Sequence, residues 1–262
     1  MPELPDVEVF RRYFDKNALH QKITRVTVEN ERVLKGTSPS GLGRKLNGRK
    51  FVRTKRHGKN MFACVDEEFW LMFHFGMTGF FKYFKNEGDQ PPHSRVTFLF
   101  DNGFHLAYDN QRMLGEVQTV KDAGNFIREN DLGEDALDLS WNAFRNLVQG
   151  RRGAVKTTLM NQGLIAGVGN IYSDEVLFQA GIHPKTKVKN LDEKLFKKLF
   201  HKMKGVLNTA IDKKANPDEF PEDYIIPHRG EDDICPKCGG KIEKIKINNR
   251  GTYFCPKCQP EK

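Results

Sequence analysis

Two Cys-x-x-Cys pairs near the C-terminus constrain the fold of this chain most strongly. Cys235 and Cys238 form the first pair, and Cys255 and Cys258 form the second after sixteen intervening residues. Each pair can place two thiolates on one ion from a tight turn, and two such pairs close a tetrahedral site with no open position. A segment this short cannot bury a core, so a metal must supply its folding free energy. The spacing therefore predicts one structural Zn²⁺.

The residues between the two pairs are expected to form a β-hairpin. Glu243–Ile247 and Thr252–Phe254 are the predicted strands, and Asn248–Gly251 is the turn between them. Arg250 then lies at the tip of a rigid finger. Its position fits a phosphate contact and an ordinary solvated charge equally well.

Bulk composition favours a globular protein with a polyanionic partner. The 262 residues carry a formal net charge of +9, with 38% hydrophobic and 29% charged residues. Four of the five cysteines are in the paired motifs, which favours metal binding over disulfides, and Cys64 is expected to be a buried small hydrophobe. No run approaches the roughly 18 apolar residues of a membrane span, and the acidic start does not fit a signal peptide. We expect a cytoplasmic protein without a membrane partner.

The first half of the chain is predicted to hold one helix followed by strands. Apolar residues recur at helical spacing within 3–19, at Leu4, Val7, Phe10 and Phe14. Residues 22–120 hold short β-rich runs broken by Gly, Asn and Asp, which is typical of an antiparallel sandwich or barrel. The expected strands are Lys22–Glu29, Lys50–Lys55, Met61–Val65, Phe69–Phe75, Gly79–Phe84, Arg95–Phe100 and Phe104–Tyr108.

The second half is predicted to be helical. A polar stretch, 121–135, is expected to link two domains. Predicted helices follow at Trp141–Val148, Ala154–Asn161 and Asn170–Gln179. A longer helix is expected to begin near Asn190, as its N-cap, with an apolar stripe that faces the core. The proline-containing, acidic stretch 215–233 is expected to be a loop.

Three glycines at Gly163, Gly167 and Gly169 precede the helix expected at Asn170. They permit positive φ and close approach of the backbone to a ligand, and the N–H groups of the next helix could receive a phosphate. A tight helix–helix turn is the alternative. A dinucleotide fingerprint is excluded by context, because the glycines follow a helix and not a strand.

The N-terminus offers a second chemical feature. Met1 before Pro2 is a start from which methionine is normally trimmed, and trimming would expose a secondary amine at Pro2. Such an amine can attack a sugar C1′ and form a Schiff base, while Glu3 could move protons there. Alternatively, Pro2 merely opens a helix and Glu3 favours its dipole.

These features together resemble the formamidopyrimidine-DNA glycosylase and endonuclease VIII family over essentially the whole chain. The resemblance rests on Pro2-Glu3-Leu4-Pro5-Asp6-Val7-Glu8, Arg56-His57-Gly58-Lys59, His74-Phe75-Gly76-Met77, Gly167-Val168-Gly169-Asn170-Ile171-Tyr172 and the four-cysteine finger.

The resemblance implies an α+β fold with a β-sandwich behind a leading helix, then a helical domain with a helix–two-turns–helix motif, then a four-cysteine zinc finger. The expected boundaries are 1–121 for the catalytic sandwich, 122–135 for a linker, 136–233 for the helical DNA-binding domain and 234–262 for the finger. DNA is expected to bind between the two globular regions.

It also implies a base-excision repair enzyme that removes oxidised bases and cuts the strand by β,δ-elimination. Oxidised purines such as formamidopyrimidine and 8-oxoguanine are the expected lesions. Pro2 resembles the family's Schiff-base nucleophile and Glu3 its general acid/base. Lys59 resembles the lysine that assists catalysis beside the phosphates. Arg250 resembles the finger arginine that grips phosphate and aids the final elimination, so Pro2, Glu3, Lys59 and Arg250 are the expected catalytic residues.

Further DNA contacts follow from the resemblance. A base must leave the duplex before its glycosidic bond can be reached, which requires phosphate clamps and an apolar wedge. The expected DNA-binding residues are His74, Met77, His93, Arg112, Leu114, Arg152, Lys156 and Asn170, of which Met77, Arg112 and Leu114 fill the space of the everted nucleotide. The expected partner is damaged double-stranded DNA, bound by a monomer without a nucleotide cofactor.

Two departures from the family pattern bear on the preferred lesion. The acidic stretch Asn216–Asp233 replaces a longer Gly/Thr-rich loop, and Leu114 stands where Phe is common, with Gln111 and Met113 flanking Arg112. Oxidised pyrimidines or abasic sites are therefore alternative substrates for the same chemistry. A non-catalytic zinc-ribbon DNA-binding protein is a further alternative, but it gives no reason for the Pro2-Glu3 pair.

Overall fold

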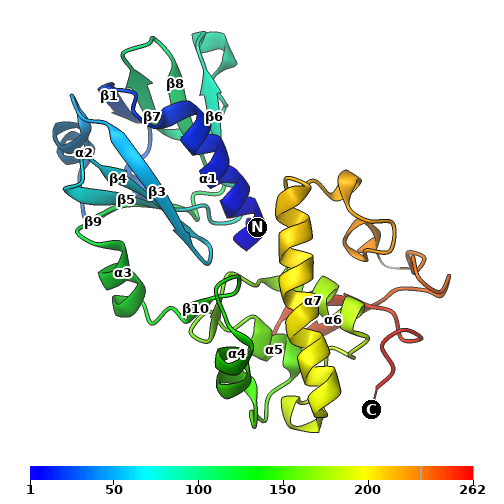
Figure 1. The fold of residues 1–262 in the computed structure, drawn as a ribbon. Coiled ribbons are helices and arrows are strands. Elements are labelled where there is room, and N and C mark those ends of the chain that lie inside the picture. The colour runs from blue at the N-terminus through cyan, green and yellow to red at the C-terminus, as the bar shows by residue number, and fades with distance from the viewer. Residues whose placement is uncertain (231, 262) are drawn as a thin grey trace. The chain divides into compact units, whose positions relative to one another are not determined.

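The computed structural model describes residues 1–230 and 232–261, which form two compact units (Figure 1). The first unit holds Met1–Pro2 and Asp6–Asp131. The second unit holds Glu3–Pro5 and Leu132–Lys262. The boundary at 131 lies inside the stretch expected to be a linker. Glu231 and Lys262, which fall in the predicted loop and finger, lie outside the described residues.

The first unit is a β-sandwich. One sheet has the order β2-β9-β5-β4-β3 and the other the order β1-β7-β8-β6, all antiparallel except for the β2–β9 pair. The strands are β1 Ile23–Val28, β2 Leu34–Lys35, β3 Phe51–His57, β4 Asn60–Val65, β5 Phe69–His74, β6 Phe80–Phe84, β7 Ser94–Phe100, β8 His105–Asp109 and β9 Glu116–Val120. Each of the seven expected strands overlaps an observed one, and β2 and β9 are additions.

Helix α1, Leu4–Ala18, packs its apolar stripe into the sandwich core. The ring of Phe14 lies 5.0 Å from that of Phe51 and 5.3 Å from that of Phe81, so α1 joins residues of both sheets. Burying each such ring contributes about 1.5–3 kcal/mol. The leading helix predicted from apolar spacing is confirmed.

Two further helices of the first unit escaped prediction. Helix α2, Pro39–Leu46, begins with a Ser38 side chain that accepts a hydrogen bond from the Gly41 N–H at 3.1 Å. Helix α3, Ala123–Glu129, lies in the stretch expected to be a linker, capped by Asp122. The ring of Phe126 lies 5.6 Å from that of Phe62, so α3 packs on the sandwich.

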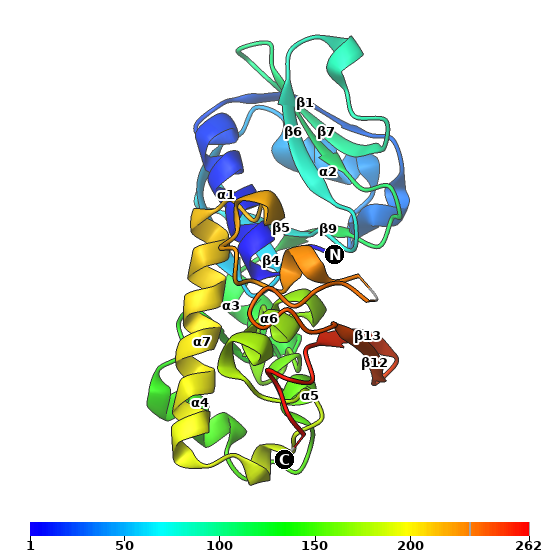
Figure 2. The ribbon, with the colours of Figure 1, turned by 90° about the vertical axis from the view of Figure 1, so that its right-hand side faces the viewer.

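The second unit is built on helices. They are α4 Trp141–Val148, α5 Val155–Leu159, α6 Asn170–Ala180 and α7 Glu193–Asp212, with a short parallel pair of β10 Glu134–Asp135 and β11 Ile165–Ala166. Figure 2 shows α7 running beside α4 and α6. The apolar stripe of α7 is buried, as predicted. The predicted cap at Asn190 is wrong, because Asp192 accepts the Leu195 N–H at 2.7 Å and Asn190 ends a separate 3-10 turn.

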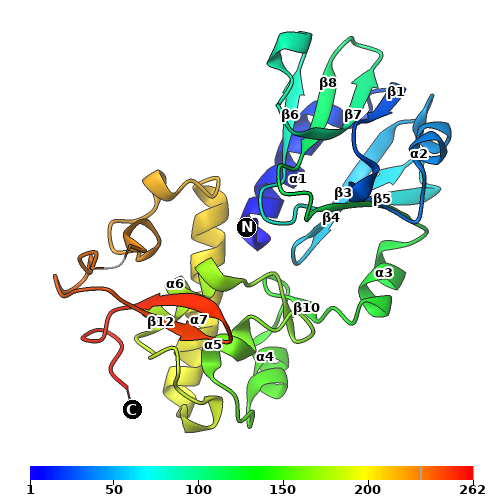
Figure 3. The same cartoon turned by 180° about the vertical axis from the view of Figure 1, so that it is seen from behind.

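The finger strands are β12 Glu243–Ile247 and β13 Arg250–Phe254, paired antiparallel as expected. Figure 3 shows this hairpin beside α5 and α6, so the finger belongs to the helical unit instead of standing apart. Among the described residues, no helix is long and apolar enough to cross a membrane.

Gly115 provides a test of the packing behind the sandwich loops. A Cβ at this position would lie 1.9 Å from the Tyr108 hydroxyl and 2.1 Å from the Asn110 amide nitrogen, both of which are buried. We expect Gly115→Ala to lower the free energy of unfolding by about 2–3 kcal/mol, because neither group can move without losing its hydrogen bonds. Urea unfolding followed by tryptophan fluorescence measures this, since Trp70 lies in the same unit.

The matched control is Gly43→Ala in helix α2, where a Cβ would meet nothing within 4 Å. This change should stabilise the first unit by about 0.5–1 kcal/mol, because alanine favours a helix over glycine. Equal stability of Gly115→Ala and the wild type would contradict the tight packing.

Candidate active site and nucleic-acid interface

The carboxylate of Glu3 occupies the N-terminus of α6. One oxygen accepts the N–H groups of Gly169 at 2.7 Å and Tyr172 at 3.2 Å, and the other accepts the Ile171 N–H at 2.8 Å. The side chain is 1% exposed. A buried carboxylate is costly unless it is hydrogen-bonded, and here the positive end of the helix dipole and three N–H donors compensate.

The glycines before α6 make room for the chain's own N-terminus. A Cβ on Gly169 would lie 2.3 Å from the Glu3 carboxyl carbon, and one on Gly167 would lie 2.5 Å from a Leu4 methyl. Gly167 also has φ +114°, and its carbonyl accepts the Leu4 N–H at 3.1 Å. The predicted close approach to the glycine backbone is therefore confirmed. The N–H groups at the start of α6, which could have received a phosphate, are bound by Glu3 instead.

Pro2 precedes this anchored residue and is half-buried, and Met1 is 40% exposed. Within α1, Glu8 lies among three arginines: its carboxylate is 2.7 Å from Arg11, 3.0 Å from Arg12 and 3.4 Å from Arg56. Burial raises the pKa of Glu8, but hydrogen bonds and charge from these arginines outweigh it and lower the pKa below its usual value.

Arg56 links α1 to the β3–β4 turn that carries Lys59. Its guanidinium also donates to the Gly58 carbonyl at 3.1 Å. Gly58 has φ +56°, as a tight hairpin turn requires. His74 pairs with Asn60 across the β4–β5 register, and its pKa is lowered by burial and by the charge of Lys59. The structure thus brings Lys59 and His74 together at one end of the five-stranded sheet.

Two touching loops at this end present the expected wedge. Gly76 approaches the next loop so closely that a Cβ would lie 2.4 Å from the Leu114 carbonyl carbon. The Arg112 N–H donates to the Thr78 hydroxyl at 3.2 Å. Met77 is 38% exposed and Leu114 54%, so two large apolar side chains face solvent where core packing does not need them.

His93 lies beside the same loops. Its N–H donates to the Asp109 carboxylate at 2.9 Å and its carbonyl accepts the Asn110 N–H at 3.0 Å. The side chain is half-buried. Of the predicted DNA contacts in the first unit, His74, Met77, His93, Arg112 and Leu114 therefore all belong to one group of neighbouring segments.

The four paired cysteines form the metal site of the second unit. Their sulfur atoms all lie within 4.8 Å of one another, and none is in a disulfide. Cys235 and Cys258 sulfurs are 3.8 Å apart, and those of Cys238 and Cys255 are 3.5 Å apart. Tetrahedral Zn²⁺ with Zn–S bonds of about 2.3 Å requires a separation of about 3.8 Å. The donor set fits a structural Zn²⁺, and the fifth cysteine, Cys64, is buried as predicted.

The finger hairpin is fixed to the helices near its tip. The Asn170 amide donates to the Gly251 carbonyl at 2.9 Å, and the Asn248 amide donates to the Thr157 hydroxyl at 3.3 Å. Arg250, between them, is exposed. The oxygen of the Asn170 side chain is buried without a hydrogen-bond partner among the described residues. The hairpin backbone next to Arg250 is therefore fixed to Asn170, the first residue of α6.

Lys156, a predicted DNA contact, is buried and paired instead of exposed to solvent. The residue is fully buried, and its ammonium lies 2.6 Å from the Asp174 carboxylate and 2.7 Å from the Thr252 hydroxyl. Burial lowers the pKa of Lys156, because the buried ammonium loses its hydration. The phosphate contact predicted for Lys156 does not fit this placement, whereas Arg152 is exposed.

Sequence reasoning missed the buried polar residues of α6. Asp174 accepts Arg229 at 2.7 Å and the Tyr253 N–H at 3.2 Å. Glu175 accepts the Ile226 N–H at 2.9 Å, and burial raises the pKa of Glu175 to about 7. These bonds hold both the finger and the predicted loop 215–233 on α6. The available signal was a run of acidic residues inside an otherwise apolar helix.

Comparison with known proteins gives a consistent result. Three family models match the chain: the formamidopyrimidine-DNA glycosylase N-terminal domain over residues 1–117, the formamidopyrimidine-DNA glycosylase H2TH domain over 132–220, and a zinc finger found in FPG and IleRS over 234–260. Together they follow the sandwich, the helices and the finger in order.

Curated relatives match over nearly the whole chain. The formamidopyrimidine-DNA glycosylase of Geobacter metallireducens is 34% identical over 270 residues, covering 99% of this chain and 100% of that protein. The enzyme of Ureaplasma parvum is 31% identical over 275 residues with the same coverage. Lactococcus lactis Fpg in complex with DNA containing an abasic site superposes with a TM-score of 0.89 at 27% identity, covering 99% of this chain and 100% of that one.

The zinc site predicts a sharp contrast between two cysteine substitutions. We expect Cys238→Ser to lose the metal and unfold the finger, because the metal supplies the folding free energy of that segment. Cys64→Ala, the matched control in β4, should keep one zinc per chain. Metal analysis of both purified proteins measures the stoichiometry. A full complement of zinc in Cys238→Ser, or none in the wild type, would contradict the assignment.

Proposed function

Because the chain belongs to the formamidopyrimidine-DNA glycosylase family, we propose that it excises oxidised purines from duplex DNA and then cuts the strand at the same nucleotide. The observation that carries the proposal is the Glu3 carboxylate bound at the α6 N-terminus, directly after Pro2. A plain helix start needs no buried acid fixed by three hydrogen bonds at this place, whereas a nitrogen nucleophile needs a proton carrier held beside it.

The proposed reaction begins once Met1 is removed. The free amine of Pro2 attacks C1′ of the damaged nucleotide, and the bond from C1′ to the base breaks as the base takes up a proton. Glu3 passes the proton released by the Pro2 amine to O4′ as the C1′–O4′ bond of the sugar breaks, so that Pro2 and C1′ are joined as an iminium. The resulting iminium makes the C2′ proton acidic, and its loss breaks the C3′–O bond. A second elimination breaks the C5′–O bond and leaves phosphates at both ends of the gap.

Phosphate contacts come from both units in this proposal. In the second unit Arg250 and Asn170 are neighbours, which supports joint contact with one stretch of backbone. In the first unit Lys59 lies at a hairpin turn beside His74, which supports a role next to the reacting sugar. Arg152 is exposed and supplies a further cation. Lys156 is left out of this set because it is buried and paired.

The exposed wedge residues support base eversion. Met77 and Leu114 offer apolar surface and Arg112 a guanidinium, all from two loops that touch. A protein that flips a base must fill the vacated space, and apolar side chains inserted into the stack do this. We therefore assign Met77, Arg112 and Leu114 to the space left by the damaged nucleotide.

For the lesion, solved relatives provide the support. Lactococcus lactis Fpg has been crystallised with DNA containing Fapy-dG and with DNA containing an abasic site. We propose the same lesion class for this chain.

We further propose catalysis in residues 1–121, with 122–135 as the connection, DNA binding in 136–233 and zinc in 234–262. We also propose that the protein is a monomer. The curated relatives are bacterial, which supports a place in the cytoplasm, at the nucleoid.

Borohydride trapping tests the nucleophile. Borohydride reduces a Schiff base, so it should fix a covalent adduct on a duplex with an abasic site or an oxidised purine, and the bond should map to Pro2. An N-terminal amine has an ordinary pKa of about 8, against about 10.4 for lysine, so more of it is unprotonated at neutral pH. Pro2→Gly should retain part of the activity, since glycine also offers an amine.

The controls separate this role from its rivals. Glu3→Gln should keep duplex binding but lose excision, because an amide exchanges no proton. Trapping that survives in Pro2→Gly but disappears in Lys59→Ala would move the chemistry to the lysine. Mass spectrometry that finds Met1 retained in active protein would exclude a Pro2 amine altogether.

The salt dependence of duplex binding tests the finger arginine. Arg250→Ala should weaken binding to every duplex and flatten the slope of log K against log salt by about one unit, because one phosphate contact is lost. Lys257→Ala is the matched control, since it removes an exposed cation from a zinc knuckle of the same finger. Identical slopes in Arg250→Ala and Lys257→Ala would make Arg250 an ordinary solvated charge.

A further inference from the structure

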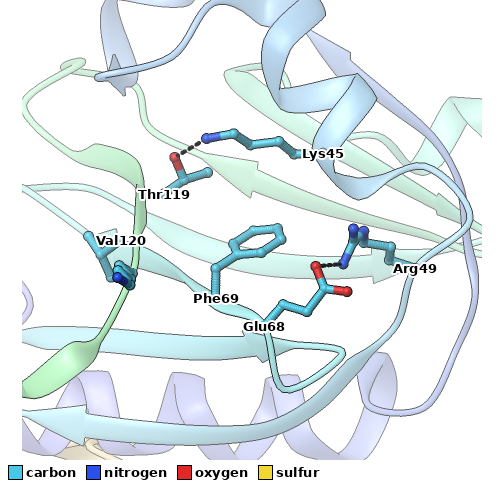
Figure 4. Close-up of a pocket in the computed structure, with 7 residues that line it drawn as sticks. Lys45, Arg49, Glu68, Phe69, Thr119 and Val120 are labelled. Carbon is cyan, nitrogen blue, oxygen red and sulfur yellow. Dashed lines mark hydrogen bonds and ion pairs between the residues drawn. The ribbon is translucent and has the colours of Figure 1, made fainter.

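A pocket of about 370 Å³ opens in the first unit at the end of the sheet opposite the proposed DNA contacts (Figure 4). Phe69, at the start of β5, lines it, whereas His74 ends the same strand. Strand β5 is six residues long, so the backbone positions of Phe69 and His74 lie about 17 Å apart. The β4–β5 register places the Lys59 turn at the His74 end, because Asn60 pairs with His74 and Val65 pairs with Phe69.

The lining combines cations with an apolar floor. Lys45 of α2 donates to the Thr119 hydroxyl at 3.0 Å, and the Arg49 guanidinium lies 2.5 Å from Glu68 and 5.7 Å from the centre of the Phe69 ring. Figure 4 shows the Phe69 ring between these two polar contacts. Lys121 also lines the pocket and is exposed, with no charged partner among residues 1–230 and 232–261. Arg49 is offset by Glu68 and by Asp66, whose carboxylate lies 3.8 Å from the guanidinium. The charges of Lys45 and Lys121 remain, and they favour an anionic ligand that also carries an apolar group.

The sheet has an open edge beside this pocket. Strand β2 pairs with β9 only at Val117 and Gln118, so Thr119 and Val120 have no strand partner on that side. A second pocket, lined by Asn125 and Phe126 of α3, shares these same two residues, and its charged lining includes Lys35, Asp122 and Glu129. One pocket therefore lies on the α2 side of the free edge and the other on the α3 side. An extended peptide that pairs with such an edge directs alternate side chains to its two sides.

We propose that this edge binds an acidic peptide segment of a partner protein, which adds as a strand beside Thr119 and Val120. An apolar or aromatic side chain of the peptide packs on Phe69, and acidic side chains two positions away on the same face approach Lys45 and Lys121. A nucleic acid could bind the cations, but it cannot pair as a β-strand with the open edge. A peptide alone uses the cations, the aromatic floor and the edge together.

Fluorescence anisotropy tests the proposal with a labelled nonapeptide that has one central Phe and an Asp two positions to each side. The full-length protein should bind this peptide, and the double variant Lys45→Glu/Lys121→Glu should weaken binding by about tenfold or more, because it sets like charges against the peptide. Lys82→Glu, an exposed charge reversal on β6, is the matched control and should bind as the wild type does. A peptide with Ser in place of Phe should bind more weakly.

Hydrogen exchange and duplex binding complete the test. Saturating peptide should slow amide exchange across residues 119–121, which contact through side chains alone would leave unchanged. Three outcomes would overturn the proposal: no binding of the peptide, equal binding by the double variant and Lys82→Glu, or a greater loss of duplex affinity in the double variant than in Lys82→Glu. The last outcome would make the pocket a DNA contact.

Discussion

The bond between the Glu3 carboxylate and the N-terminus of α6 is the constraint from which the candidate site follows. Glu3 and its three partners are at least 166 residues apart in sequence. Without Glu3, the start of α6 would have unpaired N–H groups. Without α6, the Glu3 carboxylate would be a buried charge without hydrogen bonds. The contact requires glycine at position 169, because a side chain there would occupy the space of the carboxyl group, and Gly167 makes room for Leu4. Pro2 is covalently bonded to Glu3, so any nucleophile at Pro2 works from a fixed neighbour.

Further along α6, buried polar side chains hold the finger and the loop by hydrogen bonds and ion pairs. Asn170 binds the Gly251 carbonyl, and Asp174 binds Lys156, Arg229 and the Tyr253 N–H. A lone buried Lys156 or Asp174 would be strongly destabilising, so each requires the other. Arg250 is thereby fixed from two directions, by the metal at the base of its hairpin and by α6 near the tip. Lys156 helps to hold the hairpin that carries Arg250, because its ammonium binds both Asp174 and the Thr252 hydroxyl.

The sequence predicted features whose cause is local and missed those whose cause is distant. Helix α4 has the predicted bounds because Ser140 caps it and its apolar spacing is regular. The four cysteines predict their own metal site, since ligand spacing is a short-range property. For α7 the sequence offers two good caps, Asn190 and Asp192. Only the 3-10 turn at Val188–Asn190 decides between them, so the predicted cap lies two residues before the observed one. Burial of Lys156 depends on Asp174 and Thr252, far away in sequence, which no local pattern reveals.

Different residues of α6 hold the proposed catalytic pair and the atypical loop. Glu3 binds at the first residues of α6. The stretch 216–233, which departs from the family pattern, is held further along, where Glu175 accepts the Ile226 N–H and the Gln179 amide donates to the Asp223 carbonyl at 3.0 Å. Arg229 binds Asp174, which precedes Glu175 in α6. Substitutions in the loop between its anchors at Asp223, Ile226 and Arg229 leave every bond to Glu3 unchanged. The loop and the Pro2-Glu3 pair are held by different residues of α6. An atypical loop is therefore compatible with an unaltered Pro2-Glu3 pair.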